Sequence, residues 1–538
     1  MIVEPKLIKK SFFVTALLLL FAIVINGQEK RFIVDIASGE EWWCGIVSRG
    51  TKMPLNSNST FFFDMRFNDC NQVQPLLMSN KGRIVWNNEP FTVEFKDRKI
   101  ILHGAGEFVI HEKGSTLREA QQFARRTWFP ASGNMPDSLL FSKPQYNTWI
   151  ELNFNQNQAD ILKYAHAIVD NGLPVGVLMI DDSWQQNFGI WKFRADRFPD
   201  PKGMVDELHA LGFKVMLWIV PFISPDCLAF LPLLNKEKIL IMDDAKPGHP
   251  LFIKWWEGYS AEIDFTNPNG MKWFSQQLNY LQDTYKIDGF KFDAGDFDRF
   301  PSYSGTYKKV SGNEHNSIYA SIGLKYPLNE YRATWKLGGQ ALAQRLCDKE
   351  HTWEDLRKVI PEMLVTGLVG YPFACPDMIG GGEISSFTNN LKIDQDLIVR
   401  SAQCQALMPM MQFSVAPWRI LDEVHLNALK EAVSIRIKLS PIILKLAKTA
   451  ATQGEPIIKP LDYVFPKQGF EKVADQFLLG DNLMVAPLME KNRDKRTVMF
   501  PALKKGRWLS DDGRVYKGGT VALIDVPLKR LPYFIIKE

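Results

Sequence analysis

Ile287-Asp-Gly-Phe-Lys-Phe292 is a short, mainly apolar stretch that runs directly into Asp293. Before it lies a helical pattern that begins at Asn267, has Pro268 at its first position and extends to about Tyr285. Asparagine is a favoured helix N-cap, and proline fits the first turn because the N–H that it lacks has no helical partner there. The pattern therefore predicts a helix followed by a buried strand that ends at a carboxylate.

The same alternation occurs earlier in the chain. Val175-Gly-Val-Leu-Met-Ile180 is a predicted strand that ends at Asp181-Asp182, Lys202 to Leu211 is a predicted helix stopped by Gly212, and Val215 to Val220 is the next predicted strand. Carboxylates at the ends of successive parallel strands are typical of (β/α)₈ barrels, which build active sites at that face. A doubly wound sheet would give the same local pattern, but the glycine-rich phosphate loop that such folds usually carry is absent. We therefore predict an α/β fold with a (β/α)₈ TIM barrel.

The pattern of apolar and polar residues differs on the two sides of the predicted barrel from the pattern within it. Because 538 residues exceed the usual size of one domain, we expect two to four domains. Short alternating segments such as Phe91 to Phe95 and Ile100 to His103 predict a β-rich N-terminal domain, and Thr520 to Val526 belongs to a similar region near the C-terminus. The predicted organisation is an N-terminal β-sandwich over 28–140, the catalytic barrel over 141–450 and a small C-terminal β-sandwich over 451–538.

The first residues have the pattern of a secretory signal. Lys6, Lys9 and Lys10 precede an apolar run from Phe12 to Ile25, and Asn26-Gly-Gln28 follows it. An uncleaved membrane anchor is the alternative, but the run is shorter than the ~18 apolar residues that usually span a bilayer. We predict a signal peptide over 1–27, a secreted or periplasmic protein and no stable membrane insertion after cleavage.

Composition and cysteine spacing exclude several classes of protein. The chain is 46% apolar and 23% charged with a net charge of +4, which is typical of a globular protein and argues against nucleic acid as a partner. Its six cysteines show neither CxxC nor Cys/His ligand spacing, so we expect no metal and no cofactor. A Cys44–Cys70 disulfide is one alternative for these cysteines in an oxidising compartment, and buried free thiols are the other.

The carboxylates after the predicted strands suggest glycoside cleavage. That reaction needs two carboxyl groups in different charge states, one ionised and one holding a proton for the leaving oxygen. Asp293 follows an apolar strand, and Lys291 nearby could keep a carboxylate ionised, although an ordinary helix cap would explain the same residue. Spacing does not locate the second carboxyl group, because several candidates could equally be caps or ion-pair partners, namely Asp348, Asp377, Asp181 and Asp182.

An ordered series of motifs resembles the retaining α-glycosidases of glycoside hydrolase family 31. The series comprises Lys291-Phe-Asp-Ala-Gly-Asp296, Asp348-Lys-Glu-His-Thr-Trp-Glu-Asp-Leu356, Gly367 to Tyr371 and Pro376-Asp-Met-Ile-Gly-Gly381. Glu41-Trp-Trp-Cys-Gly45 resembles the family's N-terminal loop that reaches into the pocket. Further similar segments are Asp264 to Pro268, Gly454-Glu-Pro456, Leu479-Gly-Asp481 and Val485-Ala-Pro487.

This resemblance implies roles for individual residues. Asp293 matches the nucleophile that forms a covalent glycosyl-enzyme, and Asp348 matches the general acid/base. Arg332 matches the arginine that hydrogen-bonds sugar hydroxyls, and Asp181 and Asp377 match carboxylates that accept from hydroxyls of the terminal sugar. Trp149, Trp218 and Trp256 fall where the family places pocket-wall aromatics, with packing in the core as the alternative.

Within the family, three segments look like the myogenesis-regulating glycosidase group and its bacterial relatives. They are Lys291-Phe-Asp293, Asp181-Asp-Ser-Trp184 and Pro409 to Trp418. Ser414 falls about where α-glucosidases keep a pocket histidine, and Asp296 stands where many members have glutamate. Paired aspartates with a tryptophan are also similar to α-galactosidases of related barrel families, so Asp182 and Trp184 join Lys291 as predicted substrate-binding residues.

The expected function is a retaining, exo-acting α-glycosidase that prefers α-galactosides and acts on an oligosaccharide or glycoside. An α-glucosidase or α-xylosidase of the same family is the nearest alternative. A glycan-binding protein on a lapsed scaffold would have no need for both Asp293 and Asp348, whereas a transglycosylase would share every residue named.

Overall fold

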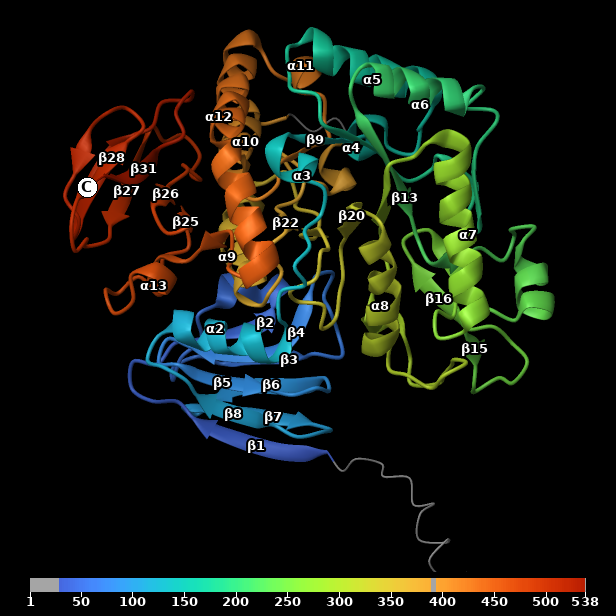
Figure 1. Ribbon diagram of the computed structural model, residues 1–538, viewed down its shortest axis with the longest axis horizontal. Coiled ribbons are helices and arrows are strands. Elements are labelled where there is room, and N and C mark those ends of the chain that lie inside the picture. The colour runs from blue at the N-terminus through green and yellow to red at the C-terminus, as the bar shows by residue number, and fades with distance from the viewer. Residues whose placement is uncertain (1–28, 389–392, 538) are drawn as a thin grey trace, which may run out of the picture.

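The computed structural model of the chain describes residues 29–388 and 393–537 (Figure 1). Blue N-terminal strands lie below a central barrel, and the red C-terminal strands lie beside the long helix α12 (Glu423–Gln453). The predicted signal peptide over 1–27 lies outside the described residues. Within the described residues, no helix is long and apolar enough to cross a membrane.

The centre of the molecule is one parallel sheet of eight strands that follow one another around it in chain order. The first and last strands along the chain pair with each other in parallel. Met378, which follows the seventh strand, forms a parallel bridge with Gln412 of the eighth, so the sheet closes into a barrel. This confirms the predicted fold. The strands are β9 (Gln145–Asn147), β10 (Val177–Ile180), β13 (Lys214–Ile219), β18 (Gly289–Phe292), β20 (Leu328–Tyr331), β21 (Gln344–Arg345), β22 (Ala374–Cys375) and β23 (Gln412–Phe413).

Helices connect successive barrel strands on the outside. Residues 332–343, between β20 and β21, contain no helix, so one βα unit is reduced to a loop. In α7 the side chain of Asn267 accepts from the backbone N–H of Asn269, and Pro268 begins the helix, as predicted. The connecting helices are α5 (Gln158–Asp170), α6 (Pro201–Ala210), α7 (Pro268–Tyr285), α8 (Gly312–Ser321), α9 (Trp353–Leu368) and α10 (Gln395–Ala406).

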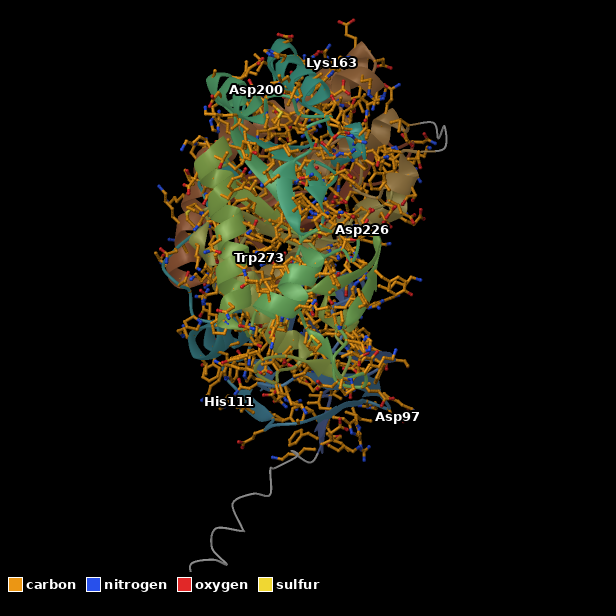
Figure 2. All side chains as sticks on the ribbon, turned by 90° about the vertical axis from the view of Figure 1, so that its right-hand side faces the viewer. Asp97, His111, Lys163, Asp200, Asp226 and Trp273 are labelled. Atoms are coloured by element: carbon orange, nitrogen blue, oxygen red, sulfur yellow. A yellow bond between two sulfur atoms is a disulfide. The ribbon has the colours of Figure 1, made fainter. Side chains whose placement is uncertain are left out.

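A long connecting segment separates β13 from α7. It folds into a small antiparallel sheet of β14 (Phe222–Ile223), β17 (Gly258–Glu262) and β16 (Phe252–Trp255). The turn between β16 and β17 carries Trp256 and Glu257. Figure 2 shows the side of the molecule on which α7 lies, with Trp273 labelled.

The N-terminal region consists of two four-stranded antiparallel sheets. One contains β1 (Lys30–Asp35), β7 (Lys99–Gly104), β6 (Phe91–Lys96) and β3 (Phe61–Asp64), and the other contains β2 (Trp42–Ile46), β4 (Val73–Ser79), β5 (Arg83–Trp86) and β8 (Val109–Glu112). The helix α2 (Leu117–Trp128) leads from these sheets to the barrel. Buried apolar residues of the sheets and the barrel form one continuous core.

The C-terminal region has a six-stranded sheet and a two-stranded sheet. Trp508, Phe500 and Phe534 pack in a core cluster of their own, because the two sheets face each other away from the barrel. The six-stranded sheet contains β24 (Ile458–Lys459), β25 (Phe477–Leu479), β26 (Leu483–Val485), β31 (Tyr533–Lys537), β28 (Arg507–Ser510) and β29 (Val515–Tyr516), and the other contains β27 (Lys495–Phe500) and β30 (Thr520–Asp525).

Candidate active site

A cavity of about 350 Å³ lies where the barrel strands end. This is within the range of about 300–1,000 Å³ typical of small-molecule sites. All but two of the predicted site residues line it: Asp293, Asp348, Asp181, Asp182, Trp149, Trp218, Trp256, Lys291 and Arg332. They converge because the carboxyl ends of all parallel barrel strands open at one face.

Asp293 follows β18 directly and is held by donors on both carboxylate oxygens. The Trp218 indole N–H donates to Oδ2 over 2.8 Å, and the backbone N–H of Ala294 donates to Oδ1 over 2.9 Å. Burial by itself would raise the pKa of Asp293, but the charges of Arg332, Lys291 and Arg345 and the indole hydrogen bond outweigh it. They hold the pKa well below its usual range, so Asp293 is ionised.

Asp348 comes from the loop between β21 and α9, and its carboxyl group is in a different environment. Its side chain is 30% exposed, against 9% for Asp293. Oδ1 of Asp348 contacts Nη1 of Arg345, and the same Nη1 donates to Asp377 Oδ1 over 2.8 Å. The cavity therefore contains one buried, strongly stabilised carboxylate and one carboxyl group that is accessible to solvent.

A buried ion pair forms a second wall. Lys291 Nζ donates to Asp181 Oδ2 over 2.7 Å, and the Asn147 side chain donates to the same oxygen over 2.8 Å. Burial lowers the pKa of Lys291, but Asp181, Asp293 and Glu330 outweigh it and raise the pKa, so Lys291 stays charged. Lys291 thus lies on β18, two positions before the nucleophile candidate Asp293, and between two carboxylates.

Asp182 has an unsatisfied buried oxygen. Oδ1 accepts from the backbone N–H of Ser183 and from the side chain of Gln185, whereas Oδ2 has no hydrogen-bond partner among the described residues. Burial, with the neighbouring charges of Glu257 and Asp181, raises the pKa of Asp182 to about 7. Asp182 thus combines a place in the cavity wall with a buried oxygen that lacks a partner there.

Trp184 and Asp377, which the sequence analysis predicts to contact substrate, do not line the cavity. Trp184 is fully buried behind Trp218 and donates its indole N–H to the Trp218 carbonyl over 2.8 Å. Asp377 is also fully buried, and it accepts from Arg345 and from the backbone N–H of Lys349 and Gly382. Both lie behind the wall of the cavity, where they support residues that do line it.

The segment that reaches the cavity from the N-terminal region is not the predicted one. Glu41-Trp-Trp-Cys-Gly45 overlaps β2, where Trp42, Trp43 and Cys44 are buried in the core. The loop before β4 reaches the cavity instead, through Cys70. Of the two alternatives for these cysteines, the Cys44–Cys70 disulfide is therefore wrong: Cys44 is a buried free thiol, whereas Cys70 is bonded to Cys347 on the barrel.

Several lining residues were not singled out by the sequence analysis. They are Cys70, Phe154, Glu257, Arg345, Cys347, Glu383 and Ile384. The positions of Cys347 next to Asp348 and of Arg345 three residues before it were the available signals. Ser414, expected near the pocket, is buried and accepts from the backbone N–H of Ile150 instead.

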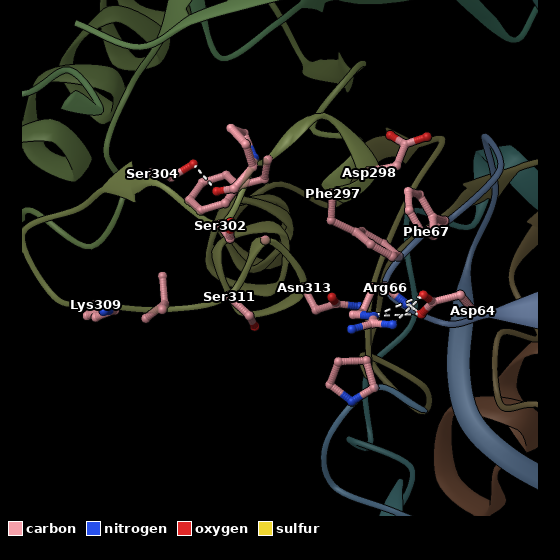
Figure 3. A pocket seen from close by; sticks show the side chains of 15 residues that line it. Asp64, Arg66, Phe67, Phe297, Asp298, Ser302, Ser304, Lys309, Ser311 and Asn313 are labelled. Carbon is pink, nitrogen blue, oxygen red and sulfur yellow. Dashed lines mark hydrogen bonds and ion pairs between the residues drawn. The ribbon is translucent and has the colours of Figure 1, made fainter. Parts of the chain in front are cut away.

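A larger cavity of about 570 Å³ lies between the N-terminal sheets and the loop after Asp293 (Figure 3). Asp64 and Arg66, which form an ion pair with each other, line one part of it, and Phe297 and Asn313 line other parts. It contains neither Asp293 nor Asp348. Among the residues that the structure describes, no three His, Cys, Asp or Glu side chains are grouped so that they could hold a metal ion.

Comparison with known families agrees with this geometry. The model of the glycosyl hydrolases family 31 TIM-barrel domain matches residues 140–446, and that of the family 31 C-terminal domain matches residues 454–538. The chain belongs to glycoside hydrolase family 31. The family resemblance predicted from the motifs is thereby confirmed.

Two relatives of the chain are a glycosidase from an animal and an alpha-glucosidase from a bacterium. The chain is 31% identical over 433 residues to the myogenesis-regulating glycosidase of Mus musculus, covering 78% of this chain and 60% of that protein. It is 24% identical over 419 residues to alpha-glucosidase 2 of Bacillus thermoamyloliquefaciens, covering 71% and 50%. The chain thus spans only about half to three fifths of the length of these family 31 relatives.

Solved structures of family 31 share the fold. The dextranase of Flavobacterium johnsoniae, complexed with glucose, superposes with a TM-score of 0.83 at 20% identity, over 95% of this chain and 67% of that chain. At this identity the likeness concerns the fold alone.

Proposed function

We propose that the chain is a retaining, exo-acting α-glycosidase with Asp293 as nucleophile and Asp348 as general acid/base. One observation carries the proposal: a buried, ionised Asp293 and a more exposed Asp348 line the same cavity at the barrel face. Retaining cleavage requires two carboxyl groups of unlike environment on either side of one glycosidic bond. The limited volume of the cavity, about 350 Å³, supports attack at a terminal sugar.

The two steps assign a proton and a bond to each residue. Asp293 attacks the anomeric carbon, the bond to the leaving oxygen breaks, and Asp348 gives its proton to that oxygen. Water then attacks the same carbon, Asp348 takes the proton of the water, and Asp293 leaves as a carboxylate.

The charge of the nucleophile changes between these steps. Asp293 is ionised before cleavage, and its ester bond to the sugar removes that negative charge until water releases it. Arg345 remains in contact with Asp348 Oδ1, so it fixes the carboxyl group that gives a proton in the first step and takes one in the second.

The experiment compares Asp293→Asn and Asp348→Asn with the wild type on nitrophenyl α-galactoside, α-glucoside and α-xyloside. We expect Asp293→Asn to lose essentially all turnover, and Asp348→Asn to lose much more on substrates with poor leaving groups than on activated ones. Asp283→Asn, at an exposed carboxylate of α7, is the matched control and should remain fully active. Proton NMR of the first product should show the α-anomer; a β-anomer would reject retention.

For the sugar, we propose an α-galactoside in preference to an α-glucoside. The buried Lys291–Asp181 pair offers both a donor and an acceptor, and Oδ2 of Asp182 lacks a partner. Such a wall can discriminate between sugars that differ at one hydroxyl, because a mismatch leaves buried polar groups unpaired. A higher kcat/KM on the α-glucoside would reject this preference without affecting the mechanism.

We also propose that the protein is exported. The apolar run after Lys6, Lys9 and Lys10 supports this, and so does the Cys70–Cys347 disulfide, since disulfides persist mainly in oxidising compartments. Fractionation of cells that express the full chain tests the proposal. Recovery of the protein with reduced Cys70 and Cys347 in the cytoplasm would contradict it.

A further inference from the structure

The loop of residues 68–72, between β3 and β4, makes an unusual set of contacts with the catalytic face of the barrel. The disulfide joins Cys70 to Cys347, the residue directly before Asp348, across 277 positions of sequence. Asn71 Oδ1 accepts from the backbone N–H of Cys347 over 2.9 Å. Gln72 Nε2 donates to the carbonyl of Arg345 over 3.2 Å and to that of Arg332 over 2.8 Å.

The loop also reaches the nucleophile side of the cavity. Asn68 Nδ2 donates to Asp296 Oδ1 over 2.8 Å, and Asp296 in turn pairs with Arg332. Asn68, Asn71 and Gln72 are all buried. Buried side-chain amides are costly unless they are paired, so these contacts fix the loop against the barrel rather than merely touching it.

Asp348 depends on its backbone for position. It lies outside any helix or strand, and the only side-chain partner of its carboxyl group among the described residues is Arg345. The barrel holds the backbone at Leu346, whose N–H donates to the Cys375 carbonyl over 2.9 Å, and after Asp348, where the Lys349 N–H donates to Asp377 Oδ2 over 2.8 Å. The N-terminal loop holds Cys347, the residue directly before Asp348.

The loop turns at two residues with left-handed backbone. Asp69 and Cys70 have φ angles of +47° and +70°, in the region that residues with a Cβ adopt at a cost. The hydrogen bonds of Asn68, Asn71 and Gln72 hold the loop on either side of this turn, and the covalent bond to Cys347 holds Cys70 itself. Loss of the disulfide removes a covalent restraint from the strained turn, which favours relaxation of its backbone.

We infer that the Cys70–Cys347 disulfide, together with the 68–72 loop, is a positioning device for the general acid/base. The inference rests on the proposed role of Asp348. The two cysteines are positioning residues: they act on the reaction through the place of the Asp348 carboxyl group, not by a chemical step of their own. Efficient cleavage of glycosides with poor leaving groups then depends on the oxidised disulfide.

The test uses the full chain with both cysteines replaced, Cys70→Ala and Cys347→Ala, and a series of aryl α-glycosides with graded leaving groups. Displacement of the acid weakens protonation of the leaving oxygen, which matters most for poor leaving groups. We expect kcat/KM to fall about tenfold further on the poorest leaving group than on nitrophenol. Partial unfolding would lower kcat/KM by the same factor on every substrate. The ratio of kcat/KM on the nitrophenyl glycoside to kcat/KM on the glycoside with the poorest leaving group therefore distinguishes a displaced acid from a loss of stability.

Reduction of the wild type is the second arm. Dithiothreitol supplies two electrons and two protons, is oxidised to its cyclic disulfide, and leaves Cys70 and Cys347 as thiols. We expect it to reproduce the change in ratio in the wild type and to have no effect on the double variant. The other four cysteines are buried free thiols, so they offer dithiothreitol no disulfide to reduce.

Two single variants complete the design. Asn71→Ala removes the acceptor of the Cys347 N–H while it keeps the disulfide, and it should shift the ratio in the same direction by a smaller factor. Cys227→Ala, at a buried thiol outside the cavity, should leave the ratio unchanged. Equal losses on all leaving groups, or full activity in the double variant, would overturn the inference. Inactivity of the wild type would instead reject the proposed function.

Discussion

Asp293 owes its charge to its neighbours rather than to solvent. Three cations and one indole N–H outweigh a burial that would otherwise favour the protonated acid. A hydrogen bond to a charged group contributes about 1.5–3 kcal/mol. The Trp218 hydrogen bond therefore stabilises the negative charge of Asp293, both before attack and when the charge returns on hydrolysis of the glycosyl-enzyme. A single substitution can remove it.

Trp218→Phe removes that donor and retains most of the aromatic wall. We expect kcat/KM to fall by about ten- to a hundredfold, which corresponds to the loss of one charge-assisted hydrogen bond. Steady-state kinetics on the best nitrophenyl glycoside measures the change. Trp191→Phe is the control, because the Trp191 indole N–H is buried without a partner and lies outside the cavity. A Trp218→Phe variant with the kcat/KM of the wild type would show that this hydrogen bond does not stabilise the nucleophile.

Asp182 should give the enzyme a titration near neutral pH. Its pKa of about 7 lies above the ordinary value, so the carboxyl group is protonated below pH 7 and ionised above it. An ionised Oδ2 is the better acceptor for a sugar hydroxyl, and kcat/KM should therefore rise as pH increases through 7. In Asp182→Asn this rise should disappear. If the variant keeps the same midpoint, another group is responsible.

Among the secondary-structure elements, those with long periodic patterns were predictable. The helix after Asn267 and the strands that end at Ile180 and Phe292 were predicted close to their observed bounds. β21, β22 and β23 contain two residues each and were not identified, because two residues carry no periodicity. Their positions depend on the neighbours that they pair with in the barrel.

The small strand β17 places Glu262 in a buried site. Burial, with Asp264 and Asp296 nearby, raises its pKa to about 8, whereas burial lowers the pKa of His315 to about 4. The contact of 3.5 Å between Glu262 Oε1 and His315 Nδ1 therefore joins two neutral groups at pH 7 rather than an ion pair.

Glu262→Gln replaces a neutral carboxyl with a neutral amide of the same shape. Between pH 4.5 and 8 the folded wild type holds a proton that the unfolded chain has lost, so its stability falls as pH rises through this window. The variant lacks that dependence. We expect it to gain at least about 1 kcal/mol relative to the wild type between pH 5 and pH 8, measured by urea unfolding. A constant difference would place the Glu262 pKa outside the window.

The whole molecule is joined near Glu455 by a charge cluster. Arg125 and Arg118 from α2, Lys459 from β24 and Asp481 from the C-terminal region meet there. Burial would raise the pKa of Glu455, but Lys459, Arg125 and Arg118 outweigh it and lower the pKa to about 2. The cluster connects α2, which follows the N-terminal sheets, with the C-terminal region that begins after α12.

Glu455→Gln should reduce the stability of the whole protein at neutral pH. The folded pKa lies below the unfolded value of about 4.5, so this stabilisation is present above pH 4.5 and is lost as pH falls toward 2. Partial exposure of the cluster reduces the expected loss to about 1–2 kcal/mol. Urea unfolding at pH 7 and pH 3 measures it, and the difference between variant and wild type should shrink at pH 3. An equal loss at both would reject the ionic explanation.

The candidate site itself was only partly predictable. Motifs identified Asp293, Asp348, Lys291 and Arg332, because each lies in a short segment whose order is typical of the family. Trp184 and Asp377 lie in such segments too, yet they are buried behind residues that line the cavity. A local motif indicates which strand end carries a residue but not whether the side chain lines the cavity or supports its wall.

Local patterns in the chain were therefore enough to predict a barrel, three of its strands and the carboxylates that follow two of them, since these depend on residues close together in sequence. The Cys70–Cys347 bond, the 68–72 loop at the cavity and the Arg345 contact with Asp348 were decided only by tertiary packing. The sequence offered Cys44 as a partner for Cys70, with buried free thiols as the alternative, whereas the structure pairs Cys70 with Cys347. Which one lies within bonding distance depends on how the N-terminal sheets pack against the barrel, and no short segment encodes that.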